Sequence, residues 1–473
     1  MESILAAREP RRVLAYFEEI SKIPRASGSE EQIAAYLIRF AKEKGLEYFC
    51  DSYNNVFIRR APVAPSEKTV LLQGHTDMVC VRTPDSTHDF AKDPLELFID
   101  DDGLLGAVGT SLGADDGAAV AMMLAALEEK ADYGLECLFT ASEEVGLIGA
   151  KHFDYTRIHS RTMINLDSED EREAVVGCAG GMRIHANRMM PSFAFSGETL
   201  KITVSGFAGG HSGADIHLGH INAVRLLAGL LARLCEKYDC RLIRLIGGEK
   251  DNAIPSLAEA ELQISDRADG DIREWFSRRR RSFGEDDRSA EISLVRQSSA
   301  GKAFDMHTTK QLCRLLSEVP NGVVSMDERL EIVKTSLNMG IVRIADGALN
   351  LDFSLRSSSE SELDALSARL REMLSAFGAA CKEHDRYPAW EYTENSPLLQ
   401  KYRAAYQSVY HTEPHVCGIH AGLECGLIYQ ALPDMDMISL GPTMYRVHTA
   451  SERLDIDSLV RFWQMLRRLL YEI

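Results

Sequence analysis

The chain has 473 residues, of which 45% are hydrophobic and 26% charged, a composition typical of soluble globular proteins. A chain of this length rarely has a single core, so two domains are expected. The formal net charge of −18 argues against nucleic acid or an anionic membrane as a partner. The ten cysteines contain no CxxC pair, which is typical of reduced thiols, and we see no signal peptide or membrane-spanning run. We therefore expect a cytoplasmic protein.

The first part of the chain alternates helices and strands. Helices are predicted over residues 11–22 and 30–45, and a hairpin over 48–59 that turns at Asn54-Asn55. Residues 82–103 are polar and read as a loop, and a helix follows Asp115. Four apolar runs are typical of strands covered on both faces: TVLLQ (69–73), LECLFT (135–140), TMINL (162–166) and DMISL (436–440).

The character of the chain changes near Pro191. Strands are predicted over residues 200–205, 241–246, 257–264, 291–296, 331–338 and 340–355, and helices over 220–237, 310–317 and 359–377. Runs of strands with helices between them predict an α+β module. The fold class is therefore α/β, with a central, mostly parallel, twisted sheet flanked by helices. Residues 1–191 and 386–473 form this domain, and residues 192–385 form an inserted α+β domain.

Ligand-type residues follow each of the four buried runs. His75 and Asp77 follow the first, Glu143 and Glu144 the second, Asp167 the third, and a loop carrying His448 the fourth. Taken singly, each of these is more often a structural residue than a functional one. Together they predict a site, because sites in open α/β sheets lie at the carboxyl edge of the strands.

Asp115 and Asp116 lie between a glycine-rich turn and a run of small residues. An aspartate in this place alone would cap the following helix. Five carboxylates at one sheet edge (Asp77, Asp115, Glu143, Glu144 and Asp167) would, however, repel one another unless cations were bound. Two divalent ions would relieve the repulsion and produce a nucleophilic water. Histidine and carboxylate ligands without cysteine favour Zn²⁺, with Mn²⁺ or Co²⁺ as substitutes.

In two of these motifs, the spacing of the residues indicates how they could divide their roles. His75 and Asp77 are two positions apart at a strand end, so Asp77 can accept the proton of one imidazole nitrogen while the other nitrogen binds metal. Glu143 and Glu144 leave the chain in different directions. One of them can therefore bind metal while the other faces the water.

The chain resembles the aminoacyl-histidine dipeptidases, a cytosolic branch of the dinuclear-zinc metallopeptidases that also include carboxypeptidase G and the tripeptide aminopeptidases. The resemblance runs from about residue 70 to 455, in the family's order and spacing. The segments that carry it are LLQGHTDMV, HDFAKDPLELFIDDDGLLGAVGTSLGADDG, TASEEVGLIGA, INLDSEDE with GCAGG, GGHSGADIHLGHINA, DNAIP, HAGLECGL and GPTMYRVHTASE.

The resemblance implies a role for each motif residue. Asp115 is similar to the bridging ligand. His75 and Asp167 would complete one metal site, and Glu144 and His448 the other. Glu143 would be the general base and Asp77 the partner of His75. The family usually has Asn where this chain has Asp116, which leaves open whether Asp116 contacts metal.

The inserted domain would then be a lid that carries His211, which is similar to the family's substrate-polarising histidine. The insertion is long enough for two α+β units, so we expect His211 to act in its own chain's site. By the same resemblance Asn252 and Arg356 would hold the C-terminal end of a substrate, and Glu424 its amino group. Arg356 suits a bidentate grip on a carboxylate.

The implied activity is hydrolysis of unblocked dipeptides such as Xaa-His by a water that bridges two Zn²⁺, with Glu143 as general base. The partner would be a small peptide, and the sequence is also compatible with a homodimer. Two alternatives stay open. One is another hydrolase of the same superfamily, a tripeptidase or aminoacylase. The other is a non-catalytic metal-binding scaffold, which would have no need of a general base.

Overall fold

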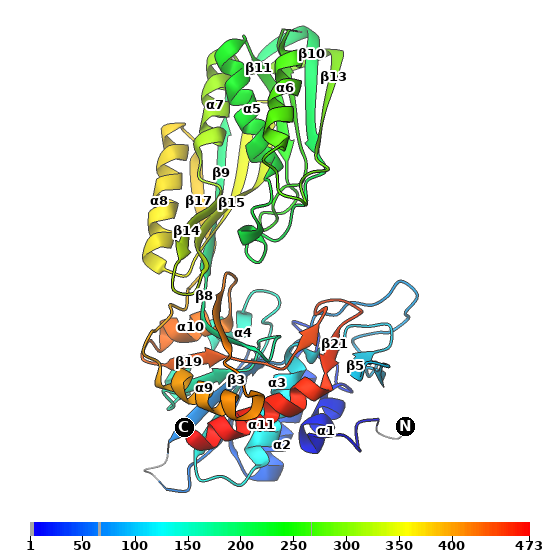
Figure 1. Ribbon diagram of the computed structural model, residues 1–473, viewed down its shortest axis with the longest axis vertical. Coiled ribbons are helices and arrows are strands. Elements are labelled where there is room, and N and C mark those ends of the chain that lie inside the picture. The colour runs from blue at the N-terminus through cyan, green and yellow to red at the C-terminus, as the bar shows by residue number, and fades with distance from the viewer. Residues whose placement is uncertain (1–3, 65–67, 266) are drawn as a thin grey trace. The chain divides into compact units, whose positions relative to one another are not determined.

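The computed structural model describes residues 4–64, 68–265 and 267–473, which form two compact units (Figure 1). The first unit comprises the chain up to Gly177, Trp390–Gly418 and Leu423–Ile473. The second comprises Cys178–Ala389 and Ile419–Gly422. The sequence placed the first boundary after residue 191, but the second unit already begins at Cys178. The reason is strand β9 (Gly180–Met189), which pairs along its whole length with a strand of the second unit.

The first unit is built on an eight-stranded sheet in which the four predicted buried strands lie side by side. These are β6 (Gly134–Thr140), β3 (Thr69–His75), β7 (Thr162–Asn165) and β19 (Asp436–Ser439), all parallel. Antiparallel neighbours extend the sheet on either side: β1 (Glu47–Cys50) and β2 (Val56–Arg60), then β8 (Glu173–Cys178), beyond which lies β18 (His415–Ile419). The predicted α/β class is confirmed.

Helix α3 (Ala114–Glu128) is the central helix of this unit. Its run of alanine, methionine and leucine is buried on all sides, and it packs against β3 and against α1 (Arg11–Ile20). Helices α9 (Pro397–Tyr410) and α11 (Ile456–Glu472) pack on each other, and α9 packs on β19. The remaining helices of the unit are α2 (Glu31–Lys44), α4 (Ile148–His152) and α10 (Glu424–Ala431).

A small four-stranded sheet in the first unit was not predicted. Its strands are β20 (Met444–Tyr445), β21 (Arg453–Asp455), β5 (Leu104–Ala107) and β4 (Leu97–Ile99), in that order. β4 lies inside residues 82–103, which the sequence assigned to a loop. Strands of two to four residues are too short to show an alternating pattern, so only pairing with distant segments defines them.

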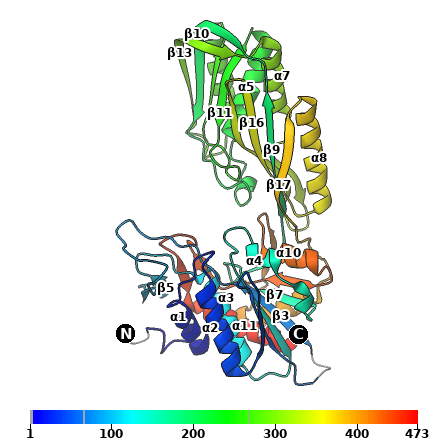
Figure 2. The ribbon, with the colours of Figure 1, turned by 180° about the vertical axis from the view of Figure 1, so that it is seen from behind.

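The second unit has a nine-stranded antiparallel sheet with helices on one face (Figures 1 and 2). The strand order is β13 (Glu291–Ala303), β10 (Phe193–Ser205), β12 (Ala258–Gln263), β11 (Arg241–Gly247), β15 (Ile332–Ala345), β16 (Ala348–Ser357), β9 and β17 (Ala380–Tyr387), with β14 (Gly322–Asp327) on β15. The helices are α5 (Ala223–Lys237), α6 (Ala268–Arg280), α7 (Met306–Glu318) and α8 (Glu360–Ala376). The inserted α+β module is thus confirmed.

The predicted boundary between the strands 331–338 and 340–355 is wrong, and β10 and β13 are longer than the predicted strands 200–205 and 291–296. The sequence ended a strand at Asn338 and began the next at Gly340, whereas β15 continues through both residues to Ala345. A bulge between Met339 and Ile341 absorbs the glycine. The hairpin turns instead at Asp346-Gly347, where φ is 53° and 82°.

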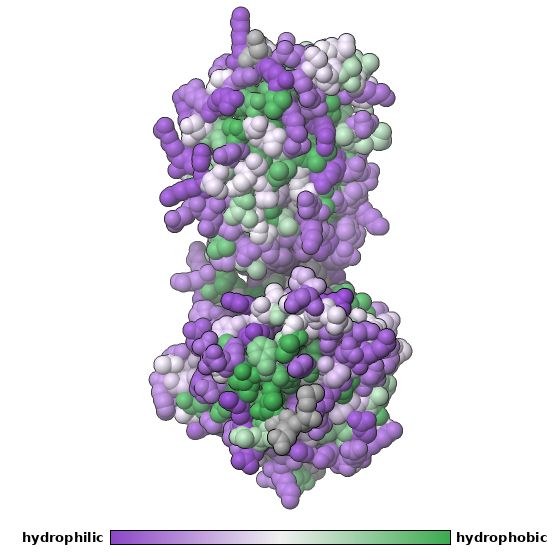
Figure 3. Space-filling view, turned by 90° about the vertical axis from the view of Figure 1, so that its right-hand side faces the viewer, coloured by the Kyte–Doolittle hydropathy of each residue, from purple (hydrophilic) through white to green (hydrophobic). Residues whose placement is uncertain are grey.

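On the face drawn in Figure 3, hydrophilic side chains predominate, and hydrophobic side chains gather in a patch on the first unit. Among the described residues, no helix is both long and apolar enough to cross a membrane.

Candidate active site

The predicted metal ligands converge at the carboxyl edge of the parallel strands. His75 ends β3, Glu144 lies four residues after the end of β6, and Asp167 lies two residues after the end of β7. His448 follows β20, and Asp115 lies in the first turn of α3. Two groups of three ligand atoms that share Asp115 form there, each with its atoms within 4.8 Å of one another. One group is His75, Asp115 and Asp167, and the other is Asp115, Glu144 and His448.

Asp115 is the residue common to both groups. Its Oδ1 lies 3.0 Å from His75 Nε2, and its Oδ2 lies 2.9 Å from His448 Nε2. Asp167 Oδ1 is 3.5 Å from His75 Nε2, and Glu144 Oε1 is 2.8 Å from His448 Nε2. The two oxygens of one carboxylate therefore face two separate sets, each with one imidazole and two carboxylates. This donor set fits a pair of Zn²⁺ ions joined by a bridging aspartate.

The electrostatics of the cluster are those of a cation site. Hydrogen bonds to Asp115 and Glu144 raise the pKa of His448 to about 11 although burial opposes the shift. Burial raises the pKa of Asp167 to about 6 against the opposing charge of His75. The cluster therefore holds more carboxylates than imidazoles, and most of these groups are shielded from water. Divalent cations would stabilise all of these carboxylates in their charged form.

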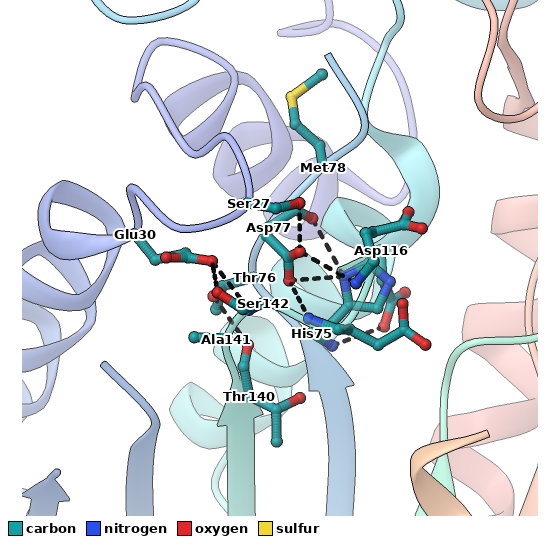
Figure 4. Close-up of polar contacts among 12 residues, drawn as sticks. Ser27, Glu30, His75, Thr76, Asp77, Met78, Asp116, Thr140, Ala141 and Ser142 are labelled. Atoms are coloured by element: carbon teal, nitrogen blue, oxygen red, sulfur yellow. Dashed lines mark hydrogen bonds and ion pairs between the residues drawn. The ribbon is translucent and has the colours of Figure 1, made fainter. Parts of the chain in front are cut away.

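Asp77 holds the ends of two strands together (Figure 4). Its carboxylate is fully buried and lies 3.4 Å from His75 Nδ1. It also accepts hydrogen bonds from the backbone N–H of Glu143 (3.0 Å) and Glu144 (3.3 Å), and from Ser27 Oγ (2.7 Å). Burial alone would raise the pKa of Asp77, but His75, Ser27 and the Glu143 amide lower it to about 2. One ionised carboxylate therefore orients both the histidine and the glutamate pair.

Glu143 lies among the ligands without belonging to either group that contains Asp115. Its carboxylate forms a third group with His75 and Glu144, again within 4.8 Å. Burial raises its pKa well above the ordinary value, and nearby Asp167 adds to the shift. A carboxylate with a raised pKa beside a metal site is a suitable proton acceptor.

Asp115 does not cap helix α3, contrary to the structural alternative for this motif. Glu452 takes that place: its buried carboxylate accepts hydrogen bonds from the N–H groups of Leu112, Gly113, Ala114 and Asp115, at 2.8–3.3 Å. The negative charge also suits a helix N-terminus. Because Glu452 satisfies these donors, the carboxylate of Asp115 is left to face the histidines. Glu452 was not predicted from the sequence.

Arg25 was missed as well. Its guanidinium is buried and donates from Nη1 to the carbonyl oxygens of Thr76 (3.1 Å) and Asp77 (3.3 Å), and from Nη2 to that of Gly113. It therefore ties the end of β3 to the start of α3. An added Cβ at Gly113 would lie 2.4 Å from Nη2, so the glycine is needed for this approach.

Asp116 lies next to the site and contacts the backbone of His75. It is fully buried, and its Oδ2 accepts the N–H of His75 at 3.1 Å. A Cβ on Gly74 would lie 2.4 Å from that oxygen, so only glycine fits there. Among the described residues Asp116 belongs to none of the ligand groups. Its second oxygen has no hydrogen-bond partner there, and burial beside Asp167 raises its pKa well above the ordinary value.

Glu424 lies in the interior of the first unit, close enough to His75 and Asp167 for their charges to act on it. It is 1% exposed, and its Oε2 accepts hydrogen bonds from Gln73 Nε2 (2.5 Å) and Thr140 Oγ1 (2.6 Å). Burial raises its pKa to about 7. A carboxylate so deeply buried acts on β3 and β6 rather than at a solvent-facing surface, which weakens its predicted contact with a substrate amino group.

His211 lies in the second unit with a defined tautomer. Its Nδ1 accepts hydrogen bonds from the N–H groups of Gly213 (3.3 Å) and Ala214 (3.0 Å), which leaves the ring proton on Nε2. Burial and nearby Arg356 lower its pKa, so the imidazole is neutral at pH 7. A neutral ring with its proton on Nε2 can donate to a developing oxyanion.

The structure brings Asn252 and Arg356 to the same part of the second unit. The Asn252 carbonyl accepts the N–H of Ser212 at 2.8 Å, beside His211. Arg356 is 7% exposed and donates from Nη1 to Tyr387 Oη at 2.7 Å. Its Nε has no hydrogen-bond partner among the described residues. A buried guanidinium with an unused donor suits an anionic group such as a carboxylate.

His420 is a further residue here that sequence reasoning missed. It is buried, its Nε2 lies 2.7 Å from Ser336 Oγ, and burial with Arg356 nearby lowers its pKa to about 3. Its Nδ1 has no partner among the described residues. The motif HAGLECGL contains both His420 and Glu424, and only the glutamate was singled out.

Comparisons with known proteins give one consistent result. A family model for peptidase family M20/M25/M40 matches residues 71–472. The chain is 36% identical over 484 residues to the cytosol non-specific dipeptidase of Escherichia coli (strain K12), covering 100% of this chain and 99% of that protein. The crystal structure of aminoacylhistidine dipeptidase from Vibrio alginolyticus matches with a TM-score of 0.93 at 31% identity, covering 100% and 98% of the two chains. A tripeptidase from Staphylococcus aureus shares the fold, with a TM-score of 0.61 at 16% identity over 98% of each chain.

Proposed function

The chain belongs to peptidase family M20/M25/M40, and on that premise we propose that it is a dinuclear zinc dipeptidase. It hydrolyses unblocked dipeptides, including Xaa-His and β-alanyl-histidine. Two full-length relatives support this: one is named a non-specific dipeptidase and the other an aminoacylhistidine dipeptidase. The name of the first also supports a cytosolic location.

His75, Asp115 and Asp167 hold one Zn²⁺, and Asp115, Glu144 and His448 hold the other. The observation that carries this proposal is the position of Asp115, whose two oxygens face two histidines at 3.0 and 2.9 Å. Ions held there would supply Lewis-acid chemistry: they would lower the pKa of a water and polarise the scissile carbonyl. Mn²⁺ or Co²⁺ can substitute, since none of the ligands is a thiolate.

The chain's own residues carry the proton. Glu143 takes the proton of the attacking water and passes it to the leaving amine. Asp77 orients His75 through Nδ1 and holds Glu143 by its backbone N–H. His211 donates from Nε2 to the oxyanion of the tetrahedral intermediate, as part of a lid formed by the second unit.

Arg356 and Asn252 hold the C-terminal carboxylate of the substrate. The unpartnered Nε and the burial of Arg356 support the ionic contact. A carboxylate held just beyond the scissile bond leaves room for one residue on each side, which selects dipeptides. Glu424 was expected at the amino group, but its hydrogen bonds to Gln73 and Thr140 favour a positioning role.

The test is hydrolysis of free and C-terminally amidated dipeptides by the purified protein, with and without a chelator. The chelator should abolish activity, and Zn²⁺ should restore it. Amidation should cost roughly 2–5 kcal/mol in kcat/KM, the loss expected when a buried charge loses its partner. Arg356→Ala should show the same loss on the free dipeptide, and the two losses should not add.

The control is Arg343→Ala in the same unit, because the Arg343 guanidinium is held by the carbonyls of Gly247 and Gly248. It should leave the preference for a free carboxylate intact. Equal cleavage of amidated dipeptides or of N-acyl amino acids would overturn the dipeptidase proposal in favour of an aminoacylase. Faster cleavage of tripeptides would favour a tripeptidase, and metal binding without any hydrolysis a scaffold.

A further inference from the structure

One group of ligand-type side chains in the described part of the chain lies outside the candidate active site. It consists of Glu173, His415 and Cys417, whose ligand atoms all lie within 4.8 Å of one another. Glu173 Oε1 is 3.4 Å from His415 Nδ1. From this geometry we propose a third metal site, which binds a thiophilic divalent cation such as Zn²⁺.

The strands place these three residues together. His415 and Cys417 are two positions apart on β18, so both side chains point to the same face of the sheet. Glu173 begins β8, the neighbouring strand. The side chains of Glu173 and His415 are 44% and 67% exposed, and Cys417 is 7% exposed. A cation can therefore reach Glu173 and His415 from solvent, while the Cys417 sulfur that it would bind is shielded from water.

The donor set selects the kind of cation. A thiolate, a carboxylate and an imidazole are three ligands typical of Zn²⁺, and a water can complete a tetrahedral site. Burial raises the pKa of the Cys417 thiol to about 12, so a bound cation must displace the thiol proton to solvent, after which the thiolate and the Glu173 carboxylate together neutralise the divalent charge. Asp170 adds negative charge nearby, although its carboxylate also accepts hydrogen bonds from Arg172. Sulfur disfavours Mg²⁺ and Ca²⁺, which prefer oxygen ligands.

The proposed third site differs from the candidate active site in its ligand types, and the chain between the two sites is held in place. None of the active-site ligands is a cysteine. Glu173 lies six positions after Asp167, but Glu171 between them is fixed by Arg461 and by Tyr410 at 2.8 Å. A cation on Glu173 should therefore bind without displacing Asp167 from its own group.

Cadmium provides a probe that reports only on thiolate. The full-length chain, saturated with Zn²⁺ at the active site and kept reduced, is titrated with Cd²⁺ while ultraviolet absorption is recorded. We expect a thiolate-to-cadmium band that saturates at one equivalent. Cys417→Ser should abolish the band. His415→Asn, at an exposed position, should weaken Cd²⁺ affinity by about tenfold or more, since even outer-shell partners of metal sites are worth about 10–100-fold.

The matched control is Cys235→Ser. The thiols of Cys235, Cys240 and Cys313 are in hydrogen-bonding contact in the second unit and are the competing source of such a band. This variant should keep the band at full amplitude. Far-ultraviolet circular dichroism checks that each variant is folded. The proposal is overturned if wild type gives no band, if His415→Asn binds Cd²⁺ as tightly as wild type, or if Cys235→Ser loses the band while Cys417→Ser keeps it. The readout needs no peptide hydrolysis, so it stands or fails independently of the dipeptidase proposal.

Discussion

The two units can be compared through their buried polar atoms that have no hydrogen-bond partner among the described residues. In the first unit these include two carboxylate oxygens, Asp116 Oδ1 and Glu424 Oε1, as well as Arg25 Nε. In the second they include two nitrogens, Arg356 Nε and His420 Nδ1, as well as Ser212 Oγ. The acidic groups at the strand ends of the first unit are suited to attract cations, and the buried Arg356 guanidinium of the second unit is suited to attract an anion. A peptidase that takes free dipeptides needs both, because its metals and its substrate carboxylate have opposite charges.

The sharpest test of the first unit separates Glu143 from Glu144. Glu143→Ala should lower kcat by about 10²–10⁴-fold, the usual value of general-base catalysis, while metal content stays near two ions per chain. Glu144→Ala should lose metal, because its Oε1 lies 2.8 Å from His448 Nε2 in the second ligand group. Elemental analysis and dipeptide turnover on the same preparations measure both effects.

The control for that pair is Glu31→Ala, an exposed position in the first turn of α2, which should change neither quantity. If Glu143→Ala loses metal while Glu144→Ala stays loaded and active, the two roles are reversed. Both outcomes would still leave Asp115 as the common ligand.

For the second unit, the corresponding change is His211→Ala. Loss of one oxyanion donor typically costs about 10²–10³-fold in kcat, and metal content should not change. His211→Gln can keep an N–H donor and should recover part of the loss. Mixing inactive His211→Ala chains with inactive Glu143→Ala chains should restore no activity. Recovery in the mixture would instead mean that His211 acts in a partner subunit's site.

The sequence anticipated the features that depend on local pattern. The four parallel strands are short apolar runs, and the residues after them must meet because parallel strands end at one edge. Features that depend on long-range contacts were missed. Glu452 reaches the Asp115 amide across 337 positions of sequence, and no local pattern marks it. The burial of Glu424 likewise depends on Gln73 and Thr140, which lie on other strands.

A smaller effect is expected from Glu452→Gln. The backbone N–H groups of residues 112–115 now share the two carboxylate oxygens of Glu452. A glutamine has only one oxygen for these donors, and its NH₂ group would face backbone N–H groups. The start of α3 should loosen, and Zn²⁺ affinity should fall by about 10–100-fold through the displaced Asp115. The measurement is the Zn²⁺ concentration that restores activity after chelation.

Glu136→Gln is the matched control for this change. Glu136 is also a fully buried acid that accepts backbone N–H groups, those of His159 and Ser160, but it lies at the other end of β6. It should lower stability without changing the Zn²⁺ requirement. An equal change in the Zn²⁺ requirement of both variants would mean that Glu452 acts on stability alone.

The smallest effect on turnover is expected from Glu424→Gln, which tests the unpartnered oxygen in the first unit. Burial raises the pKa of Glu424 from 4.5 to about 7, so the folded state holds this proton more tightly than the unfolded state. The resulting stabilisation is complete below pH 4.5 and is lost as the pH rises through 7. Each pH unit between the two values costs about 1.4 kcal/mol, so raising the pH from about 5.5 to 8 should cost wild type about 2 kcal/mol.

Glutamine stays neutral and can still accept from Gln73 and Thr140, so the variant should lack this part of the pH dependence. The measurement is urea unfolding of chelator-treated wild type and Glu424→Gln at both pH values. The difference in unfolding free energy between the two proteins should shift in favour of the variant as the pH rises. A difference that does not change with pH would mean that Glu424 is ionised in the folded protein. In that case Glu424 would not be an acid that holds a proton in the first unit. A charged Glu424 would need a cation, such as a substrate ammonium group, beside it.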